Sequence, residues 1–369
     1  MQRQAKFTFT TRQTLLIDAP SDNGDSEAPN PHLRTEPAGR LRSKDIARLV
    51  GVSQATVSNA INRPHLVAPK TRAEIVRIMS ASGYSVNSTA RALKSGIGQA
   101  IGVVVLDVAN PFWGEVIKGV ETVTSAGQIP LIIGSSNEDA GTERRILESF
   151  ESQGVRGVLV APTHANLPTL RRFQAKGIKV VLLDKEDPEG EFPSMSLDHA
   201  AGAATAARFL LDGGHRRFAL VNGSPDISWC SSRSRGFHAE CGGVAGAVVQ
   251  EFNMSAMTVE EGWRSVSLLL AVEPAVTAVF CANDMLALGV LKGLAQRGIE
   301  VPRQMSVVGY DDAMFSELLS PGLTTVRQSA ADIGRQAGLL IAPEFAPAEE
   351  RGVLPHPRLV VRGSARALS

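Results

Sequence analysis

The apolar positions of residues 44–62 recur at the spacing of a helix and fall into two groups. Gly51 separates the groups and suits a left-handed turn, which residues with a Cβ adopt only at a steric cost. Ser53 follows and is a favourable N-cap for a second helix. The pattern predicts two short helices joined by a tight turn. The apolar positions are Ile46, Ala47, Val50, Val57, Ala60 and Ile61.

From residue 97 the apolar positions form short continuous runs rich in Val, Ile and Leu. Amphipathic segments near 112–126, 142–153 and 167–176 separate the first of these runs. Strands that are apolar throughout and alternate with helices predict parallel sheets covered on both faces. Two such sheets fit the length, at about 97–196 and 197–327. The runs are 101–106, 130–133, 158–160, 179–183, 218–221, 278–280 and 306–309.

Positive charge is concentrated in the segment from residue 40 to residue 94. It holds ten Lys and Arg residues against Asp45 and Glu74, which gives +8, whereas the whole chain is +1. The remainder of the chain is therefore net acidic. A local positive field of this kind suits the binding of a polyanion.

Polar residues lie on the outer surface of the second predicted helix and suit contact with DNA bases. A helix-turn-helix presents this surface to the major groove, where Gln and Asn can pair with adenine through two hydrogen bonds. The alternative is a small helical pair with a polar face, because short matches arise by accident. The local charge favours DNA. The outer residues are Gln54, Ala55, Thr56, Ser58 and Asn59.

Several predicted strands are followed directly by polar residues. Ligands of open parallel sheets bind at the carboxyl ends of the strands. A single Asp in such a place can equally be a helix cap, but a set of carboxylates and amides with Arg233 suits a polyhydroxylated ligand. Phe112 or Trp113 can cover an apolar sugar face. The strand-end residues are Asp107, Asn137, Asp184, Asn283 and Asp311.

Residues 41–95 resemble the DNA-binding headpiece of the lactose-repressor (LacI/GalR-type) family of bacterial transcription factors. The resemblance rests on Lys44-Asp45-Ile46-Ala47, Val50-Gly51-Val52-Ser53, Thr56-Val57-Ser58, Ile61-Asn62, Thr71-Arg72, Gly83-Tyr84, Asn87 and Ala90-Arg91-x-Leu93-Lys94. It continues in Asn110-Pro111-Phe112, Leu183-Asp184, Leu197-Asp198, Gly214-His215-Arg216-Arg217, Arg233 with Gly236-Phe237, Asn283-Asp284, Val307-Val308-Gly309-Tyr310-Asp311-Asp312, Leu323-Thr324-Thr325-Val326, Gly334 and Pro357-Arg358-Leu359-Val360-Val361-Arg362.

The resemblance implies an α/β fold in which a helix-turn-helix headpiece precedes a two-lobed, periplasmic-binding-protein-like core of parallel sheets. We expect a disordered extension at 1–40, the headpiece at 41–86, a hinge helix at 87–96 and an effector-binding and dimerisation core at 97–369. Lobe one would comprise about 97–196 and 330–357, and lobe two about 197–327 and 358–369.

The resemblance also carries over a set of DNA contacts. Leu93 stands where the family wedges a Leu into the minor groove. A linker with a buried Leu is the alternative, and a segment of nine residues is too short to be a stable helix alone. The implied DNA-binding residues are Lys44, Ser53, Gln54, Ala55, Thr56, Ser58, Asn59, Asn62, Arg91, Leu93 and Lys94.

A second set of residues is implied to bind a small effector between the lobes. Met257 departs from the family, in which many members have an aromatic ring there, and Cys241-Gly242-Gly243 departs from a helix usually rich in Ala and Leu. Both departures bear on the identity of the sugar. The resemblance implies Pro111, Asp184, Arg233, Asn283, Asp311 and Gln328 as effector-binding residues, and the strand-end pattern and aromatic residues add Asp107, Phe112, Trp113 and Asn137.

These observations predict a sequence-specific transcriptional repressor controlled by a sugar or sugar derivative. Its expected partners are double-stranded operator DNA, a sugar or sugar acid, and a second copy of the chain, because only five residues follow Ser364 and leave no room for a tetramerisation helix. No membrane partner, metal or cofactor is expected. Three dispersed cysteines predict neither disulfides nor zinc binding, which favours the cytoplasm.

Three alternative functions stay open at this point. The chain can be a sugar-binding module without a regulatory role, or a regulator that responds to a small molecule other than a sugar. An enzyme on a two-lobed fold is the third. The expectation is against an enzyme because the sequence lacks a nucleophile elbow, a phosphate-binding loop and metal-ligand spacing, and His215 has no apparent nucleophile partner.

Overall fold

A computed structural model of this chain describes residues 42–82, 100–163, 166–185, 187, 189–345 and 354–368, without the side chain of Asn62. The chain divides into two compact units, Met1–Val86 and Asn87–Ser369, which are described separately. The predicted extension at 1–40 and the predicted hinge helix at 87–96, with Arg91, Leu93 and Lys94, lie outside the described residues.

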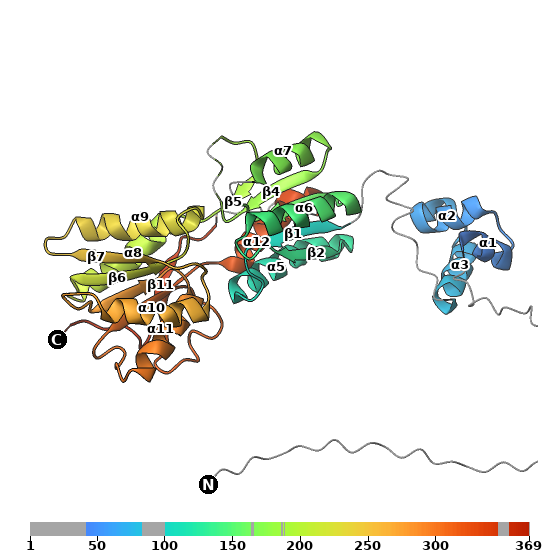
Figure 1. The fold of residues 1–369 in the computed structure, drawn as a ribbon. Helices are drawn as coiled ribbons and strands as arrows, with labels where there is room; N and C mark the ends of the chain where they lie inside the picture. Colours follow the sequence, from blue (N-terminus) through green and yellow to red (C-terminus); the bar gives the residue numbers. More distant parts are fainter. Residues whose placement is uncertain are drawn as a thin grey trace, which may run out of the picture. The chain divides into compact units, whose positions relative to one another are not determined.

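The described part of the first unit is a small helical domain (Figure 1, blue). Its elements are α1 (Ser43–Val50), α2 (Gln54–Asn62), the 3-10 helix η1 (Pro64–Leu66) and α3 (Pro69–Ala81). Gly51 ends α1 with a φ of 74°, and the Ser53 hydroxyl caps α2 by accepting the Thr56 N–H at 3.0 Å. The predicted turn and cap are therefore confirmed. The buried core is Ile46, Ala47, Val57, Ala60, Val67 and Ile75.

The start of α1 is held by backbone and side-chain bonds around Arg42 and Ser43. Ser43 is the first residue of the helix, and Arg42 is its N-cap. The Arg42 backbone N–H donates to Asp45 Oδ2 at 2.8 Å. The Ser43 hydroxyl accepts a hydrogen bond from Gln54 Nε2 at 2.8 Å, which ties the first turns of the two helices together.

The second unit contains two sheets, as the sequence predicts. The first has the strand order β2-β1-β3-β4-β5, and all of its paired strands are parallel. Its strands are β1 (Ile101–Val105), β2 (Leu131–Ser135), β3 (Gly157–Val160), β4 (Lys179–Leu183) and β5 (Ser194–Met195). The helices that follow these strands or return to this sheet are α5 (Pro111–Thr124), α6 (Ala140–Gln153), α7 (Leu167–Ala175) and α12 (Ala330–Ile341).

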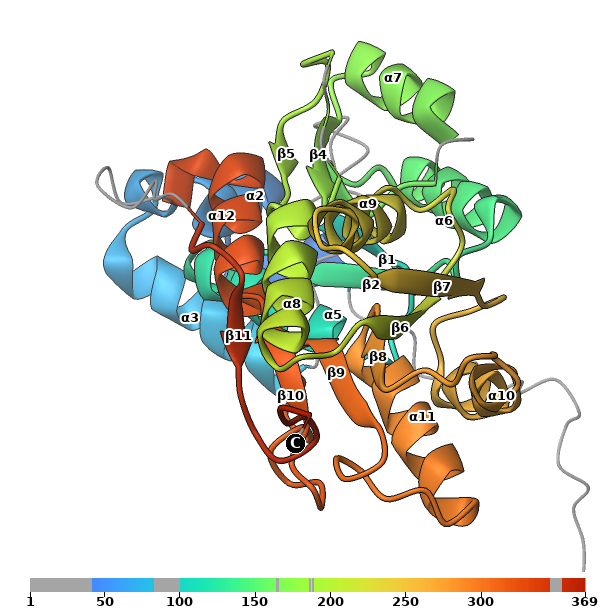
Figure 2. The same cartoon turned by 90° about the vertical axis from the view of Figure 1, so that its left-hand side faces the viewer.

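The second sheet has the order β11-β10-β9-β8-β6-β7, and β11 alone among the described strands runs antiparallel. Figure 2 shows α8 and α9 on one face of this sheet and α10 and α11 on the other. The strands are β6 (Arg217–Asn222), β7 (Val248–Asn253), β8 (Ala278–Cys281), β9 (Ser306–Asp311), β10 (Thr324–Arg327) and β11 (Arg358–Val360). The helices are α8 (His199–Asp212), α9 (Ser228–Gly242), α10 (Val259–Leu270) and α11 (Asp284–Gln296).

Helix α12 carries the chain back from the second sheet to the first, where it packs against α5 and β4 (Figure 1). The crossing is close enough to require glycine. A Cβ at Gly334 would lie 1.8 Å from the Val116 carbonyl oxygen, and a Cβ at Gly119 would lie 2.1 Å from that of Ala331. The two backbones therefore touch directly, so this crossing fixes α12 on the first sheet.

Candidate nucleic-acid surface and effector cavity

The helix-turn-helix of the first unit exposes the residues predicted to lead into a groove. Lys44, Ser53, Gln54 and Ala55 are exposed, whereas Thr56, Ser58 and Asn59 are half-buried. The Ser53 and Thr56 hydroxyls lie 2.9 Å apart, so both are tied to the cap of α2. Of these residues, Gln54 offers an amide on the leading surface, at present bonded to Ser43. The predicted contact of Asn62 involves a side chain outside the described residues.

The cations of this unit are exposed and mostly lack an acidic neighbour. Within the described residues, the headpiece ion pairs are Arg48 with Asp45 at 3.8 Å and Arg77 with Glu74 at 2.6 Å. The remaining cations are left to interact with phosphates, which carry most of the affinity in protein–DNA binding. They are Arg42, Lys44, Arg63, Lys70 and Arg72.

In the second unit, a cavity of about 610 Å³ lies between the two sheets' ends. Residues after β1, β2 and β4 line it from one side, and residues after β6 and β7 line it from the other. Its polar lining comprises Asn137, Glu138, Thr163, Asp184, Lys185, Ser224, Asp226, Ser228 and Ser255, with Leu106, Ile227 and Trp229 among the apolar lining.

A second cavity of about 400 Å³ lies where the chain crosses between the lobes. The start of α5, the end of β9 and the segment from β10 to α12 line it. Four of the ten predicted effector-binding residues lie here, namely Pro111, Phe112, Asp311 and Gln328. Asn137 and Asp184 line the first cavity.

Strained backbone is concentrated at these two cavities. Among the described residues, six residues other than glycine have a positive φ, and five of them line one of the two cavities. Positive φ costs a residue with a Cβ on the order of 1–3 kcal/mol and is typical of functional sites. The five are Asn137 (51°), Glu138 (60°), Asp184 (53°), Asp311 (115°) and Asp312 (58°).

A chain of buried polar groups connects the two cavities. Asp184 Oδ1 lies 2.6 Å from His199 Nε2, and the other ring nitrogen lies 3.3 Å from an Arg233 amino group. Arg233 approaches Asp311 at 3.7 Å, and Asp311 Oδ1 accepts from Gln328 Nε2 at 2.7 Å. A neutral His199 that donates from Nε2 and accepts at Nδ1 satisfies both neighbours. The chain thus joins β4 of the first sheet to β9 of the second.

Arg233 is the centre of this chain and is 1% exposed. Its guanidinium donates to the Ala282 carbonyl and lies between two rings, 4.2 Å from the centre of Trp229 and 3.7 Å from that of Tyr310. Cation–π contacts of a desolvated Arg add about 2 kcal/mol or more. The side chain therefore belongs to the buried chain between the cavities and lines neither of them.

The surroundings move the carboxyl pKa values in opposite directions. Burial opposes ionisation of Asp184, but His199 and Arg233 hold its pKa below the usual range. Burial raises the pKa of Asp311 to about 7, although Arg233 opposes the shift. Burial, and then the charge of Asp107, raise the pKa of Glu138 to about 7, although the Met257 N–H bonds the Glu138 carboxylate. Opposed shifts of this kind are typical of binding sites.

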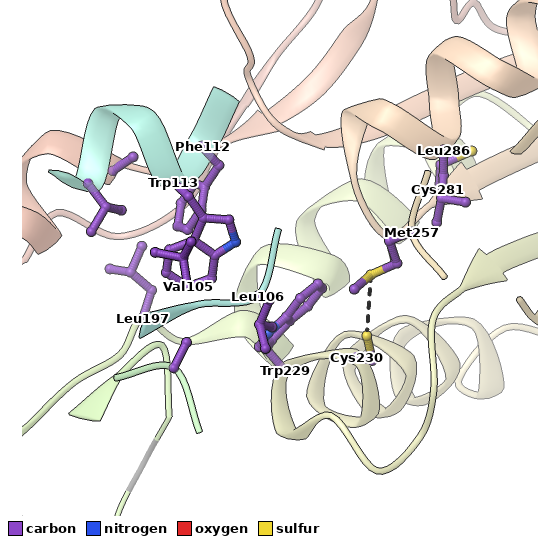
Figure 3. Close-up of a cluster of buried hydrophobic side chains, with 14 of the residues drawn as sticks. Val105, Leu106, Phe112, Trp113, Leu197, Trp229, Cys230, Met257, Cys281 and Leu286 are labelled. Carbon is purple, nitrogen blue, oxygen red and sulfur yellow. Dashed lines mark hydrogen bonds between the residues drawn. The ribbon is translucent and has the colours of Figure 1, made fainter. Parts of the chain in front are cut away.

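Three predicted effector-binding residues have structural roles. Trp113 is 3% exposed and packs edge-on against Phe112, with ring centres 5.1 Å apart, inside the hydrophobic core (Figure 3). Asn283 caps α11 and donates to the Met257 carbonyl at 3.2 Å. Asp107 accepts the Ala109 N–H at 2.8 Å in its own turn. None of the three lines either cavity.

The sequence reasoning missed several residues of the site. His199 and Tyr310 belong to the buried chain and its stacked rings, and Glu138, Lys185 and Trp229 line the first cavity. Glu138 directly follows the polar run after β2, which was a usable signal. Nothing in the sequence indicates that His199 reaches Asp184. His199 directly follows the cap residue of α8, and a polar residue at the start of a helix looks the same in the sequence whether it is exposed or forms a buried bridge.

Met257, where the family resemblance led us to expect an aromatic ring, is buried and does not line the first cavity. Met257 is 6% exposed, and its sulfur accepts a hydrogen bond from Cys230 at 3.6 Å (Figure 3). Trp229, on the first turn of α9, instead presents an aromatic surface to the cavity. An aromatic wall is therefore present at this site, supplied by a different element.

The described residues contain no cluster of three or more His, Cys, Asp or Glu side chains suited to a metal ion. No described helix has both the length and the apolar character needed to cross a lipid bilayer.

Two family descriptions match parts of this chain. Residues 44–87 match "Bacterial regulatory proteins, lacI family", and residues 207–365 match "Periplasmic binding protein-like domain". The regulator GalS of Salmonella typhimurium is 33% identical over 84% of this chain and 90% of its own length. The repressor PurR of Pasteurella multocida is 29% identical over 88% of this chain and 98% of its own.

Solved structures agree with this assignment. A LacI family regulator from Enterococcus faecalis with bound ribose is 28% identical, with a TM-score of 0.65 over 73% of this chain and 100% of its own. The lac repressor dimer bound to operator and an anti-inducer has a TM-score of 0.74 at 22% identity over 89% of this chain and 100% of its own, which shows a shared fold. This chain belongs to the LacI family of bacterial regulatory proteins and is a DNA-binding transcriptional regulator with a ligand-binding core.

Proposed function

We propose that this regulator is a repressor that binds a pseudo-palindromic operator as a homodimer and changes its operator affinity when a sugar or sugar derivative occupies the cleft between its lobes. It acts in the cytoplasm, where operator DNA is, and it has no catalytic role. The cleft residues of this proposal are Asn137, Asp184, Asp311 and Gln328 with Pro111 and Phe112, while Arg233 holds the wall behind them.

The observation that carries the effector site is the concentration of strained polar residues from both sheets at two cavities, which a chain of buried polar groups connects. A volume of about 610 Å³ falls in the ordinary range of small-molecule sites. Carboxylate, amide and hydroxyl groups are the partners that sugar hydroxyls need. Trp229 supplies the apolar surface for a sugar face. The relative from Enterococcus faecalis, whose structure holds ribose, supports a sugar as the ligand class.

On the DNA side, α2 reads the major groove through Gln54, Ala55, Thr56 and Asn59. Leu93 wedges into the minor groove, and Lys44, Arg91 and Lys94 neutralise phosphates. Because five exposed headpiece cations have no carboxylate partner among the described residues, the affinity falls steeply with salt.

Exposed apolar side chains of the second unit support association of two copies. Strand β2 is an edge of its sheet and exposes 47% of Ile133, while Met314 and Leu318 expose 76% and 75%. Burial of these side chains against a second copy would remove their apolar area from water. A dimer also matches the two half-sites of a palindrome.

The test is operator binding by fluorescence anisotropy, with DNA from the upstream region of this gene and a panel of sugars and sugar acids. We expect one class of sugar to change the affinity by about 5- to 150-fold, the usual size of allosteric coupling. Leu93→Ala should weaken operator binding with no loss of sugar binding, whereas Leu49→Ala, on an exposed position of α1, should leave both unchanged. DNA binding that no sugar alters would contradict the proposed effector class.

A further inference from the structure

The second cavity contains a buried hydrogen-bond acceptor that has no donor. Gln328 is 4% exposed and lines this cavity, and its amide nitrogen donates to Asp311 Oδ1 at 2.7 Å. Its Oε1 has no hydrogen-bond partner among the described residues. Because the amide nitrogen is held by Asp311, the oxygen is the end of the side chain that is left for a ligand. A buried acceptor of this kind favours a ligand that brings an N–H or O–H group.

The first turn of α12 lines the same cavity and offers the opposite kind of group. Residues 329–332 belong to its lining. The hydrogen bonds of the helix begin with that from the Ile333 N–H to the Ser329 carbonyl, and the Ser329 side chain caps none of the N–H groups of the first turn. Such N–H groups have no partner within the helix and carry partial positive charge. The cavity therefore presents hydrogen-bond donors within four residues of the Gln328 acceptor.

The charged side chains that line this cavity are already paired within the protein. Each lining carboxylate has a cationic partner, and Arg327, the one Lys or Arg among the described lining residues, is paired as well. A ligand ammonium or carboxylate would have to compete with these pairs, whereas the Gln328 oxygen and the N–H groups of α12 are neutral. The lining therefore favours a neutral ligand group with both a donor and an acceptor. The pairs are Glu115–Lys118, Asp311–Arg233, Asp312–Arg327 and Asp332–Arg335.

Apolar groups line the cavity beside these polar groups. Pro111 and Phe112 come from the start of α5, and Ala313 and Met314 come from the segment after β9. A hydroxyl group carries its donor and its acceptor on one atom and offers no apolar contact. An acetamido group separates its N–H donor from its carbonyl acceptor and ends in a methyl group. It therefore matches this lining better than a hydroxyl group does.

We propose that the effector is an N-acetylated amino sugar whose acetamido group occupies the second cavity. The amide N–H donates to Gln328 Oε1, the amide oxygen accepts from the first turn of α12, and the methyl group contacts Pro111 and Phe112. This inference rests on the proposed function, because it narrows the sugar derivative of that proposal to one class and assigns its amide to one cavity.

The test uses sugars that differ only at C2. Isothermal titration calorimetry on the full chain would compare the 2-acetamido-2-deoxy sugar, the parent sugar and the 2-amino-2-deoxy sugar of D-glucose, D-galactose and D-mannose. In at least one series we expect the acetamido sugar to bind at least about tenfold more tightly than its parent, because it gains a hydrogen bond and buries a methyl group. The amino sugar should bind no more tightly than the parent, because the carboxylates of the cavity are already paired.

Two further comparisons assign the gain to the Gln328 oxygen. An N-methylacetamido sugar has no N–H and should lose most of the gain on the unchanged chain, so this comparison does not depend on the folding of a variant. Gln328→Met keeps a side chain of similar length without the acceptor and should remove the preference for the acetamido sugar. Gln153→Met, at an exposed position of α6, is the matched control and should keep the preference.

Three results would overturn the inference: an acetamido preference that survives in folded Gln328→Met, undiminished binding of the N-methylacetamido sugar, or tightest binding of the amino sugar. Equal binding of the acetamido and parent sugars overturns this inference alone. No binding by any of the sugars, with operator binding intact, overturns the sugar effector as well.

Discussion

The headpiece and the effector cavity place their recognition groups in opposite ways. In the headpiece, the exposed groups sit on regular helices, and six buried apolar residues hold those helices together. In the cavity, the groups sit on strained strand ends and a buried polar chain holds them. Regular helices tolerate changes on the surface because exposed side chains contribute little to stability. The cavity wall does not, because its polar groups satisfy one another.

This difference suits the two tasks. A DNA-reading surface must present side chains to a large, flat polyanion, and exposed cations on short helices do this at little cost. A small ligand requires groups fixed within a fraction of an ångström, and strained backbone with buried hydrogen bonds supplies that precision. The predictions below separate the two designs.

The largest effect is expected in the cavity wall. Arg233→Ala leaves buried carboxyl groups and His199 without their cation, which should lower the free energy of unfolding of the core by about 3–5 kcal/mol. Effector response should be lost, while the headpiece still binds operator. Denaturation by urea and anisotropy on the same samples would measure both. Arg235→Ala, exposed on the same helix with one bond to Ser232, should change neither. If operator binding by Arg233→Ala still responded normally to the effector, the proposed role of Arg233 in holding the cavity residues in place would be wrong.

A comparable loss is expected in the headpiece, but confined to it. Ile46 is fully buried in the small core, so Ile46→Ala should cost about 2–5 kcal/mol, a large part of what a domain of this size has. Operator binding should disappear, while calorimetry should show the core melting at an unchanged temperature. Leu49→Ala, on the same helix and 58% exposed, is the matched control. A shifted melting of the core in Ile46→Ala would show that the two units fold together.

The two designs also differ in how far the sequence predicts them. Helical period, the turn at Gly51 and the cap at Ser53 are local features, so the headpiece follows from the sequence almost element by element. The apolar runs likewise predict four of the five described strands of the first sheet and three of the six of the second. Strand β7 was missed because half of its residues are polar, and β10 because three of its four residues are Thr or Arg. Strands β5 and β11 have only two and three residues, which give no pattern.

The site is less predictable because its contacts are long-range. Asp184, Asp311 and Gln328 could be selected by their place after strands or by family resemblance. His199 bridges Asp184, which lies 15 positions before it, and Arg233, which lies 34 positions after it. No local sequence pattern predicts contacts over such separations. Trp113 shows the converse, since an aromatic residue after a strand packed into the core while Trp229 lines the cavity.

A smaller effect is expected from the reading helix. Gln54→Ala removes an exposed amide and should weaken operator binding by about 1–3 kcal/mol, with most of the loss at one base pair. Stability should hardly change, because the bond to Ser43 is exposed. Lys44→Ala should instead weaken binding to every sequence and reduce the salt dependence by about one phosphate contact. Equal losses on specific and non-specific DNA for Gln54→Ala would remove it from base reading.

The smallest effect concerns the pH dependence of the core. The pKa of Glu138 is about 7 in the folded chain against an ordinary value of 4.5, because burial disfavours the charged carboxylate, so the folded state holds the proton more tightly. Between these values the folded chain binds more protons than the unfolded one, and this group therefore lowers stability as the pH rises through the window. Glu138→Gln should stabilise the core by about 1–2 kcal/mol at pH 8, allowing for partial solvent screening, and by nothing near pH 4.5. Asp311 also has a pKa of about 7. It contributes the same dependence of the unfolding free energy on pH to the unchanged protein and to Glu138→Gln, so its contribution cancels when the two are compared.

Glu148→Gln removes the same charge at an exposed position of α6 and is the matched control. Urea denaturation of Glu138→Gln and Glu148→Gln at the two pH values would measure the gain in unfolding free energy. An equal gain in both variants would show that it comes from the change in net charge and not from the position of Glu138 at the strained strand end.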